Sequence, residues 1–242
     1  MVYSIEGNII YILIYLLNLK LFLINKIFYF YLNSVTMITN LQNIDSLSVI
    51  DNQYVTKQNG TFYIRESGIF SVKRFITDSD GNELFKFKLL RDGFTLFGQN
   101  KNPILNATVN TRGNKELNIY IGNEKDKLIS VFRKNLKSNY GEQSYTASFF
   151  NKTTGNEEVL EIVHNKFKKN DTVYLYKGTN NERIICKIQR SGRKFSLEVP
   201  AFVDYVYMIT IGLCLLKFSD IENLESFEQA NDGNQINNYQ YS

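Results

Sequence analysis

The run from Tyr205 to Leu216 most constrains the fold, because as a helix it is apolar on every face apart from Thr210. Pro200 precedes it, which suits a helix start, and Asp204 offers an acceptor for the free N–H groups of a first turn. A helix that is hydrophobic all round is either a membrane span or enclosed by protein. The run covers about 18 Å, against about 30 Å for a bilayer core. Its length predicts an enclosed helix over residues 202–217.

Residues 50–199 alternate short β-rich runs with turn signals. The clearest turn is 78–82, where Asp-Gly supplies the positive φ of a tight hairpin. Two phenylalanines then alternate with two lysines over 85–88, which is typical of a half-buried antiparallel strand. The spacing predicts about twelve short strands in an antiparallel sandwich or barrel, and a barrel could enclose the apolar helix. The predicted strands are 61–66, 69–75, 83–89, 93–97, 104–110, 116–121, 127–134, 145–150, 157–163, 172–177, 183–189 and 193–199.

The residue composition argues against metal sites and most nucleophilic catalysis. The chain of 242 residues has one histidine and two cysteines, whereas a structural zinc site takes about four such ligands. His164 is predicted to be an ordinary strand-end histidine, since no nucleophile or orienting acid lies near it in sequence. Cys186 and Cys214 are predicted to be small buried apolar residues. We expect no metal and no cofactor.

Residues 1–36 carry a second apolar run at 9–32. Three interpretations stay open: a signal-anchor helix, a helix packed on the domain, or an extension that is not native and precedes Met37. Lys20 would cost about 2.5–3.5 kcal/mol in the middle of a membrane span. The expected location is therefore cytoplasmic or membrane-associated, with a single-pass anchor if 9–32 is native. The following domain is expected to cover 37–218, and the polar, acidic stretch 219–242 is predicted to be disordered.

The net charge of +4 is unevenly distributed along the chain. Residues 124–194 hold 15 basic and 8 acidic side chains, a net charge of +7. Two basic clusters fall near predicted turns, so both could lie at one end of a barrel and attract phosphates or an anionic membrane, at about 1 kcal/mol per charge. The alternative is a solvated face that keeps the protein soluble. The candidate binding residues are Lys166, Lys168, Lys169, Arg190, Arg193 and Lys194.

Two segments resemble a known family. The stretch 76–85, ITDSDGNELF, is similar to a D-x-x-G-N-x-x-F hairpin of the LURP-one-related proteins, and Val203-Asp204 is similar to their entry into a central helix. That family is described as sharing the fold of tubby proteins and phospholipid scramblases. The resemblance implies a mainly β fold, a closed antiparallel barrel of about twelve strands around a hydrophobic C-terminal helix. The stretch 194–199 has one carboxylate, so the calcium-binding segment of scramblases is not expected here.

The first functional hypothesis is a non-enzymatic barrel that binds anionic phospholipid, phosphoinositide or a phosphate-bearing partner at its basic end. No nucleic acid partner is expected, because no nucleic-acid module appears and the pI is only 8.8. The second hypothesis is a small enzyme on the same barrel, using carboxylates such as Glu158, Glu161 or Asp171. The third is a membrane protein with two spans, 9–32 and 202–218. The protein partner and the oligomeric state stay open.

Overall fold

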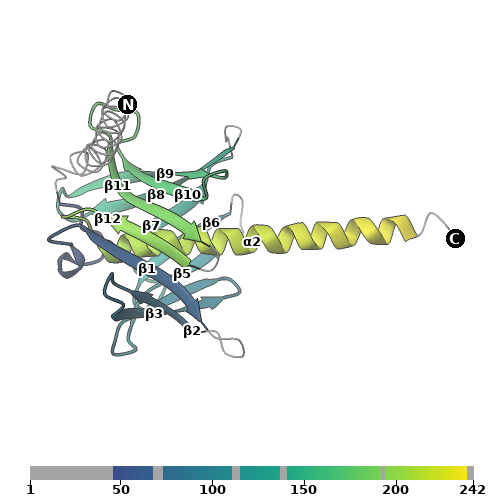
Figure 1. Ribbon diagram of the computed structural model, residues 1–242, viewed down its shortest axis with the longest axis horizontal. Coiled ribbons are helices and arrows are strands. Elements are labelled where there is room, and N and C mark those ends of the chain that lie inside the picture. The colour runs from purple at the N-terminus through teal and green to yellow at the C-terminus, as the bar shows by residue number, and fades with distance from the viewer. Residues whose placement is uncertain (1–45, 68–72, 111–114, 137–140, 192–193, 239–242) are drawn as a thin grey trace, which may run out of the picture. The chain divides into compact units, whose positions relative to one another are not determined.

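The computed structural model describes residues 46–67, 73–110, 115–136, 141–191 and 194–238, with side chains described as far as residue 222. Within these ranges the chain forms twelve strands, one short 3₁₀ helix and one long α-helix (Figure 1). In chain order they are η1 (Asn52–Tyr54), β1 (Gly60–Ser67), β2 (Lys73–Thr77), β3 (Glu83–Leu90), β4 (Gly93–Phe97), β5 (Pro103–Asn110), β6 (Glu116–Ile121), β7 (Leu128–Lys134), β8 (Glu142–Asn151), β9 (Asn156–Asn165), β10 (Asn170–Leu175), β11 (Arg183–Ser191), β12 (Lys194–Val199) and α2 (Tyr205–Asn238).

The strands form one closed antiparallel barrel. Each strand pairs with the strands before and after it in sequence, and β1 pairs with β12 to close the sheet. At this closure Gly60 lies opposite Val199, and Arg65 lies opposite Lys194. The predicted barrel is confirmed, and the sandwich alternative is wrong because closure leaves no pair of separate sheets.

Each predicted strand overlaps an observed one, and the differences lie at the ends. The strand predicted at 69–75 is observed as β2, Lys73–Thr77, while 68–72 lie outside the described residues. Strand β8 extends beyond the predicted 145–150, because its polar ends also pair with β9 over the full length of both strands. Polar strand ends carry no apolar alternation, which is the signal that marks a strand in sequence.

In most strands alternate side chains are buried in the barrel interior, whereas β4 is buried over four consecutive residues. In β8 the buried residues are Gln143, Tyr145, Ala147, Phe149 and Asn151, each separated by a less buried neighbour. The ring of Phe149 lies 5.3 Å from that of Tyr207 on the helix. The barrel interior is therefore filled by side chains of the strands and of the helix.

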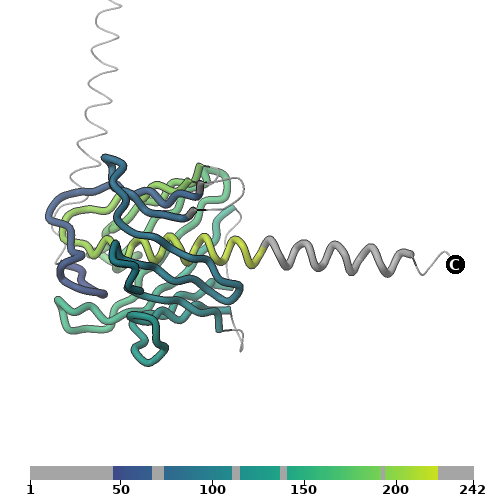
Figure 2. The backbone as a smooth tube through the Cα atoms, turned by 90° about the horizontal axis from the view of Figure 1, so that it is seen from below, coloured from purple at the N-terminus to yellow at the C-terminus, as the bar shows by residue number. Residues whose placement is uncertain are grey.

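The first part of α2 runs along the barrel axis (Figure 2). Its side chains from Val206 to Ile211 are 0% exposed, so the strands cover every face of this segment. At Gly212 an added Cβ would lie 3.1 Å from Ile64 and 3.3 Å from Leu197. The absence of a side chain there lets the helix approach β1 and β12. The enclosed apolar helix is confirmed, and a membrane span at 202–218 is wrong.

The helix begins three residues later than predicted. Phe202 adopts a left-handed φ of 65°, and Val203 and Asp204 form bridges to Leu47 and Val55 instead of helical turns. Asp204 caps the helix, since its Oδ1 accepts a hydrogen bond from the N–H of Tyr207 at 3.0 Å. The prediction that Asp204 satisfies free N–H groups is confirmed, with the helix beginning at Tyr205.

The predicted helix end at residue 217 is wrong, because α2 extends to Asn238. The helix thus overlaps the stretch 219–242 for which disorder was predicted from the sequence. Glu222 shows one cause: its carboxylate accepts hydrogen bonds from Lys134 Nζ at 2.5 Å and Gln143 Nε2 at 3.2 Å. These contacts with β7 and β8 hold the helix as it leaves the barrel, and an acidic composition does not reveal such partners.

The apolar run at 9–32 lies outside the described residues, as does the expected domain start at 37. Among the described residues, no helix has the length and apolar character needed to cross a bilayer.

Candidate functional site

The two ends of the barrel differ in their chemistry. We call the end at which α2 leaves the exit end; its described part includes the turns 91–92 and 166–169 and the strand ends around Lys134, Arg190 and Lys194. The opposite end, called the cap end, is closed by residues 47–56, which hydrogen-bond to the segment 202–204 before the helix. Each end contains a cavity.

The exit cavity lies between α2 and the ends of four strands. Its volume is about 500 Å³. The lining residues are Ile64, Glu66, His164, Lys166, Lys169, Arg190, Phe195, Leu216, Ser219 and Asp220. Three of the six residues predicted from sequence as anion-binding candidates, Lys166, Lys169 and Arg190, thus line one cavity.

The structure joins the two basic clusters of the sequence. The N–H of Arg190 donates to the carbonyl of Lys169 at 3.1 Å, so the β9–β10 turn lies against the end of β11. Lys168 is exposed on the same turn, and Lys194 is exposed at the start of β12, which pairs with β11. Arg193 lies outside the described residues. Within the described part of the chain, no ion pair is formed by Lys166, Lys168, Lys169 or Lys194.

Arg190 is held by a buried carboxylate. Its Nε and Nη2 donate to the two oxygens of Asp171 at 2.9 and 3.1 Å, and the side chain of Asp171 is 0% exposed. Asp171 Oδ1 also lies 2.8 Å from Nδ1 of His164. The guanidinium carbon of Arg190 lies 5.4 Å from the ring centre of Phe195. Arg190 therefore has a fixed orientation, whereas the lysines extend from the turn.

Sequence reasoning did not find the supporting role of Asp171. The residue lies opposite His164 in the β9–β10 pair, and 19 residues before Arg190. A predicted hairpin pairing of 163–165 with 170–172 would have placed Asp171 opposite His164. The contact of Asp171 with Arg190 depends in addition on the register of β11. His164 lies at the end of β9, as predicted.

Two carboxylates reduce the positive charge of the exit cavity. Glu66 accepts from Arg74 Nε at 2.5 Å, so its charge is largely balanced. Burial raises the pKa of Asp220, while the nearby Lys217 opposes that shift. Lys217 itself donates to the carbonyl of Leu90 at 2.8 Å. Asp220 is thus the carboxylate that most directly opposes anion binding here.

The three carboxylates suggested for an enzyme do not form one site. Glu158 lies near the cap end and accepts from Asn151 and Thr154. Glu161 lies 3.7 Å from Lys177, and Asp171 is paired with Arg190. None of the three lines the exit cavity or the cap cavity.

The thiols and metal-ligand types show no reactive grouping in the part of the chain that is described. Cys186 and Cys214 are buried, as predicted, and burial raises the pKa of each thiol. Within that part, no three His, Cys, Asp or Glu side chains group so as to hold a metal ion.

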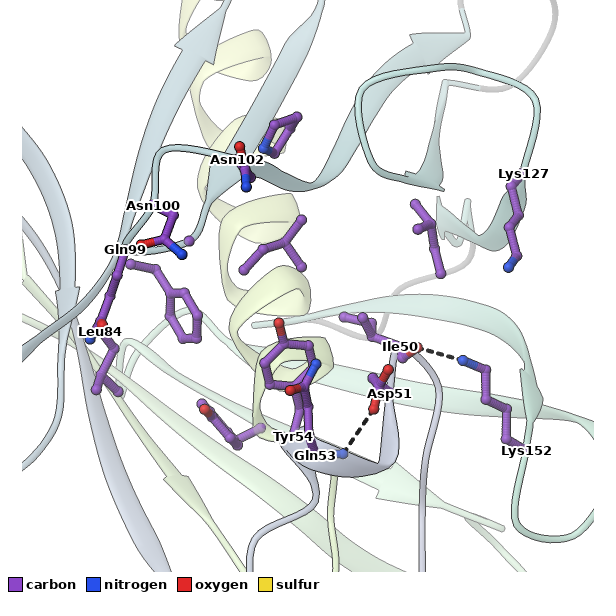
Figure 3. Close-up of a pocket in the computed structure, with 16 residues that line it drawn as sticks. Ile50, Asp51, Gln53, Tyr54, Leu84, Gln99, Asn100, Asn102, Lys127 and Lys152 are labelled. Carbon is purple, nitrogen blue, oxygen red and sulfur yellow. Dashed lines mark hydrogen bonds between the residues drawn. The ribbon is translucent and has the colours of Figure 1, made fainter.

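The cap cavity is larger, at about 750 Å³ (Figure 3). Its floor is apolar and aromatic and includes Tyr54, whose ring meets that of Tyr205 edge to face at 6.0 Å. Its walls carry amides, among them Gln99 and Asn100. Lys152 on its rim donates to the carbonyl of Ile50. The charged lining residues of this cavity are Asp51, Lys127 and Lys152, a net charge of +1, and Lys127 is the lysine without such a contact.

Comparisons with known proteins agree with this architecture. The family model for LURP-one-related proteins matches residues 60–216. The X-ray structure of a protein from Arabidopsis thaliana aligns with a TM-score of 0.54 and 20% identity, covering 71% of this chain and 98% of that one. No curated protein matched the chain in sequence. Because the family model covers most of the barrel and the enclosed part of α2, the chain belongs to the LURP-one-related family.

Proposed function

We propose that the protein is a non-enzymatic binding module whose exit end binds the phosphate groups of anionic phospholipids, including phosphoinositides. One observation carries the proposal: basic clusters more than 20 residues apart in sequence meet at one cavity, joined by the backbone hydrogen bond from Arg190 to Lys169. Lysines bind phosphate as mobile point charges, whereas a fixed guanidinium adds directed donors.

The charge balance at this end favours an anion. The cavity lining has three basic residues, Lys166, Lys169 and Arg190, and two acidic ones, Glu66 and Asp220, a net charge of +1. Adding the exposed Lys168 and Lys194, together with Asp171, the buried partner of Arg190, makes the net charge +2. Each lysine near an anionic membrane contributes about 1 kcal/mol, an attraction that salt screens.

The test is binding of the full chain to vesicles. Affinity for phosphatidylcholine vesicles with and without phosphatidylinositol 4,5-bisphosphate is measured at about 0.1 M and about 1 M salt, where the Debye lengths are about 10 and 3 Å. We expect binding that requires the anionic lipid and falls at high salt. Replacing Lys166, Lys168, Lys169 and Lys194 by Gln should weaken it on the order of 10²–10³-fold.

A matched control distinguishes the contribution of the exit end to vesicle binding from the contributions of net charge and of the apolar run at 9–32. Four exposed lysines in cap-end loops, Lys57, Lys101, Lys125 and Lys127, are replaced by Gln in the same full chain. This variant has the same net charge as the exit-end variant, and we expect it to retain most of the affinity. Equal losses in both variants, or no loss in either, would refute the exit end as the binding site.

A further inference from the structure

The two most exposed large apolar side chains of the described residues lie at the exit end. Leu136 is 82% exposed and Phe167 is 71% exposed. Phe167 lies on the β9–β10 turn between Lys166 and Lys168, and Leu136 follows β7 two residues after Lys134. Single exposed apolar residues are common, but these two share an end of the barrel with the unpaired lysines.

The turn holds Phe167 in a defined place. The N–H groups of Phe167 and Lys168 both donate to the Asn165 side chain, at 3.1 and 2.9 Å. The N–H of Lys166 donates to the carbonyl of Gly141 at 3.0 Å, which ties this turn to the start of β8. A Cβ on Gly141 would lie 2.1 Å from the Phe167 ring, so the ring rests directly on the glycine backbone. The ring therefore packs on the start of β8 with one side, while 71% of the residue remains exposed.

A soluble phosphate would make use of the lysines alone. A bilayer surface offers both chemistries together, because anionic headgroups lie just outside an apolar acyl region. Apolar side chains next to lysines match this arrangement of headgroups outside acyl chains. The Phe167 ring can enter the acyl region while the flexible lysines remain among the headgroups. An anionic lipid surface is the ligand that can contact both the lysines and the exposed apolar side chains of Phe167 and Leu136.

We propose that Phe167 and Leu136 insert into the boundary between headgroups and acyl chains of an anionic bilayer, while Lys166, Lys168, Lys169 and Lys194 contact the headgroups. This inference rests on the proposed function and specifies its ligand as a membrane surface and not a soluble phosphate compound. It also orients the barrel, with the rim that carries Phe167 and Leu136 against the lipid and α2, which extends beyond this end to Asn238, running along the membrane surface.

The chain has no tryptophan, so a single one reports on its surroundings. Phe167→Trp is compared with Phe202→Trp, a control at the cap end where the native side chain is 53% exposed. Each full-length variant is mixed with phosphatidylcholine vesicles containing phosphatidylserine, with and without brominated acyl chains. We expect a blue shift and bromine quenching at position 167 and neither at position 202.

A second variant tests the energetic contribution. Phe167→Ala should weaken vesicle binding roughly 10- to 100-fold, the range for withdrawing one such side chain from an apolar phase. It should leave binding of water-soluble inositol 1,4,5-trisphosphate unchanged, whereas the four-lysine variant should lose both ligands.

The outcomes separate the two proposals. Salt-dependent vesicle binding without a blue shift at 167, or an unchanged affinity of Phe167→Ala, overturns insertion and leaves headgroup binding in place; the exposed tips would then belong to another contact, such as a protein surface. Vesicle binding that the four-lysine variant retains in full overturns the proposed function, and this inference with it.

Discussion

At the scale of single residues, Asp204 joins the helix to the barrel cap. Its Oδ2 accepts from the N–H groups of Val49 and Ile50 at 3.1 and 2.7 Å, while Oδ1 caps the helix through Tyr207. Its capping role could be predicted from sequence, because Asp before an apolar run is a common N-cap. Its bonds to residues some 150 positions earlier could not, since no local pattern encodes them.

Asp204→Asn should therefore destabilise the protein. Asn caps helices about as well as Asp, so the bond to Tyr207 can persist. The amide nitrogen would then face the N–H groups of Val49 and Ile50, leaving buried donors without an acceptor at a cost of about 1–3 kcal/mol. Urea unfolding measures the change, with Asp51→Asn as control, where an exposed cap is replaced by an equally good one. Equal midpoints for the two variants would contradict this role.

A second residue-scale prediction concerns Asp220 and pH. Because burial raises its pKa in the folded state, the neutral form is favoured by folding. Its contribution to stability is thus fully present below the unfolded pKa, near 3.8, and is lost as the pH rises through the higher folded value. Asp220→Asn, which is always neutral, should be more stable than the native protein at pH 7.

The same change should strengthen binding of anionic vesicles at pH 7, because it removes a negative charge from the exit cavity. Native affinity should rise as the pH falls toward the Asp220 pKa, and the variant should show a smaller rise. His164, Glu66 and Arg74 lie near the same cavity, so the difference between the two profiles isolates Asp220. Parallel profiles of equal affinity would show that Asp220 does not oppose the ligand.

At the scale of elements, apolar patterning predicted the strands and turn composition predicted their connections. The alternation over 85–88 is observed as buried phenylalanines and exposed lysines in β3. The exit cavity was less predictable. Its basic residues could be predicted from the sequence as two clusters. Their proximity in space depends on the register of β9, β10 and β11, which includes a bulge between Val173 and Tyr174. The continuation of α2 past residue 217 was missed because Glu222 is held there by contacts with other strands.

The packing of α2 against β1 and β12 gives the element-scale prediction. Gly212→Leu would place a side chain where even a Cβ lies 3.1 Å from Ile64 and 3.3 Å from Leu197. Overpacking of this kind costs about 1–3 kcal/mol, which a lower urea midpoint should report. Adding Leu197→Ala makes room, so the double variant should lose less than the sum of the two single changes. Strict additivity would contradict direct contact.

At the scale of the whole molecule, the barrel and the first part of α2 share one core. The helix fills the interior that the closed sheet surrounds, so neither can bury its apolar side chains without the other. Domains with a single core of this kind commonly unfold as one cooperative unit. The two cysteines of the chain report separately on the barrel and the helix, because Cys186 lies in β11 and Cys214 lies in α2.

Both thiols should become reactive at the same urea concentration. In the folded protein they are 1% and 0% exposed, and burial raises their pKa values, so a thiol-reactive chromogenic reagent should label neither. The single-cysteine variants Cys186→Ala and Cys214→Ala each leave one reporter, and each labelling midpoint is compared with the unfolding midpoint of the same variant. Coincident midpoints are expected if helix and barrel unfold together. Labelling of Cys214 well below the unfolding midpoint, with Cys186 still protected, would instead mean that the helix leaves an intact barrel.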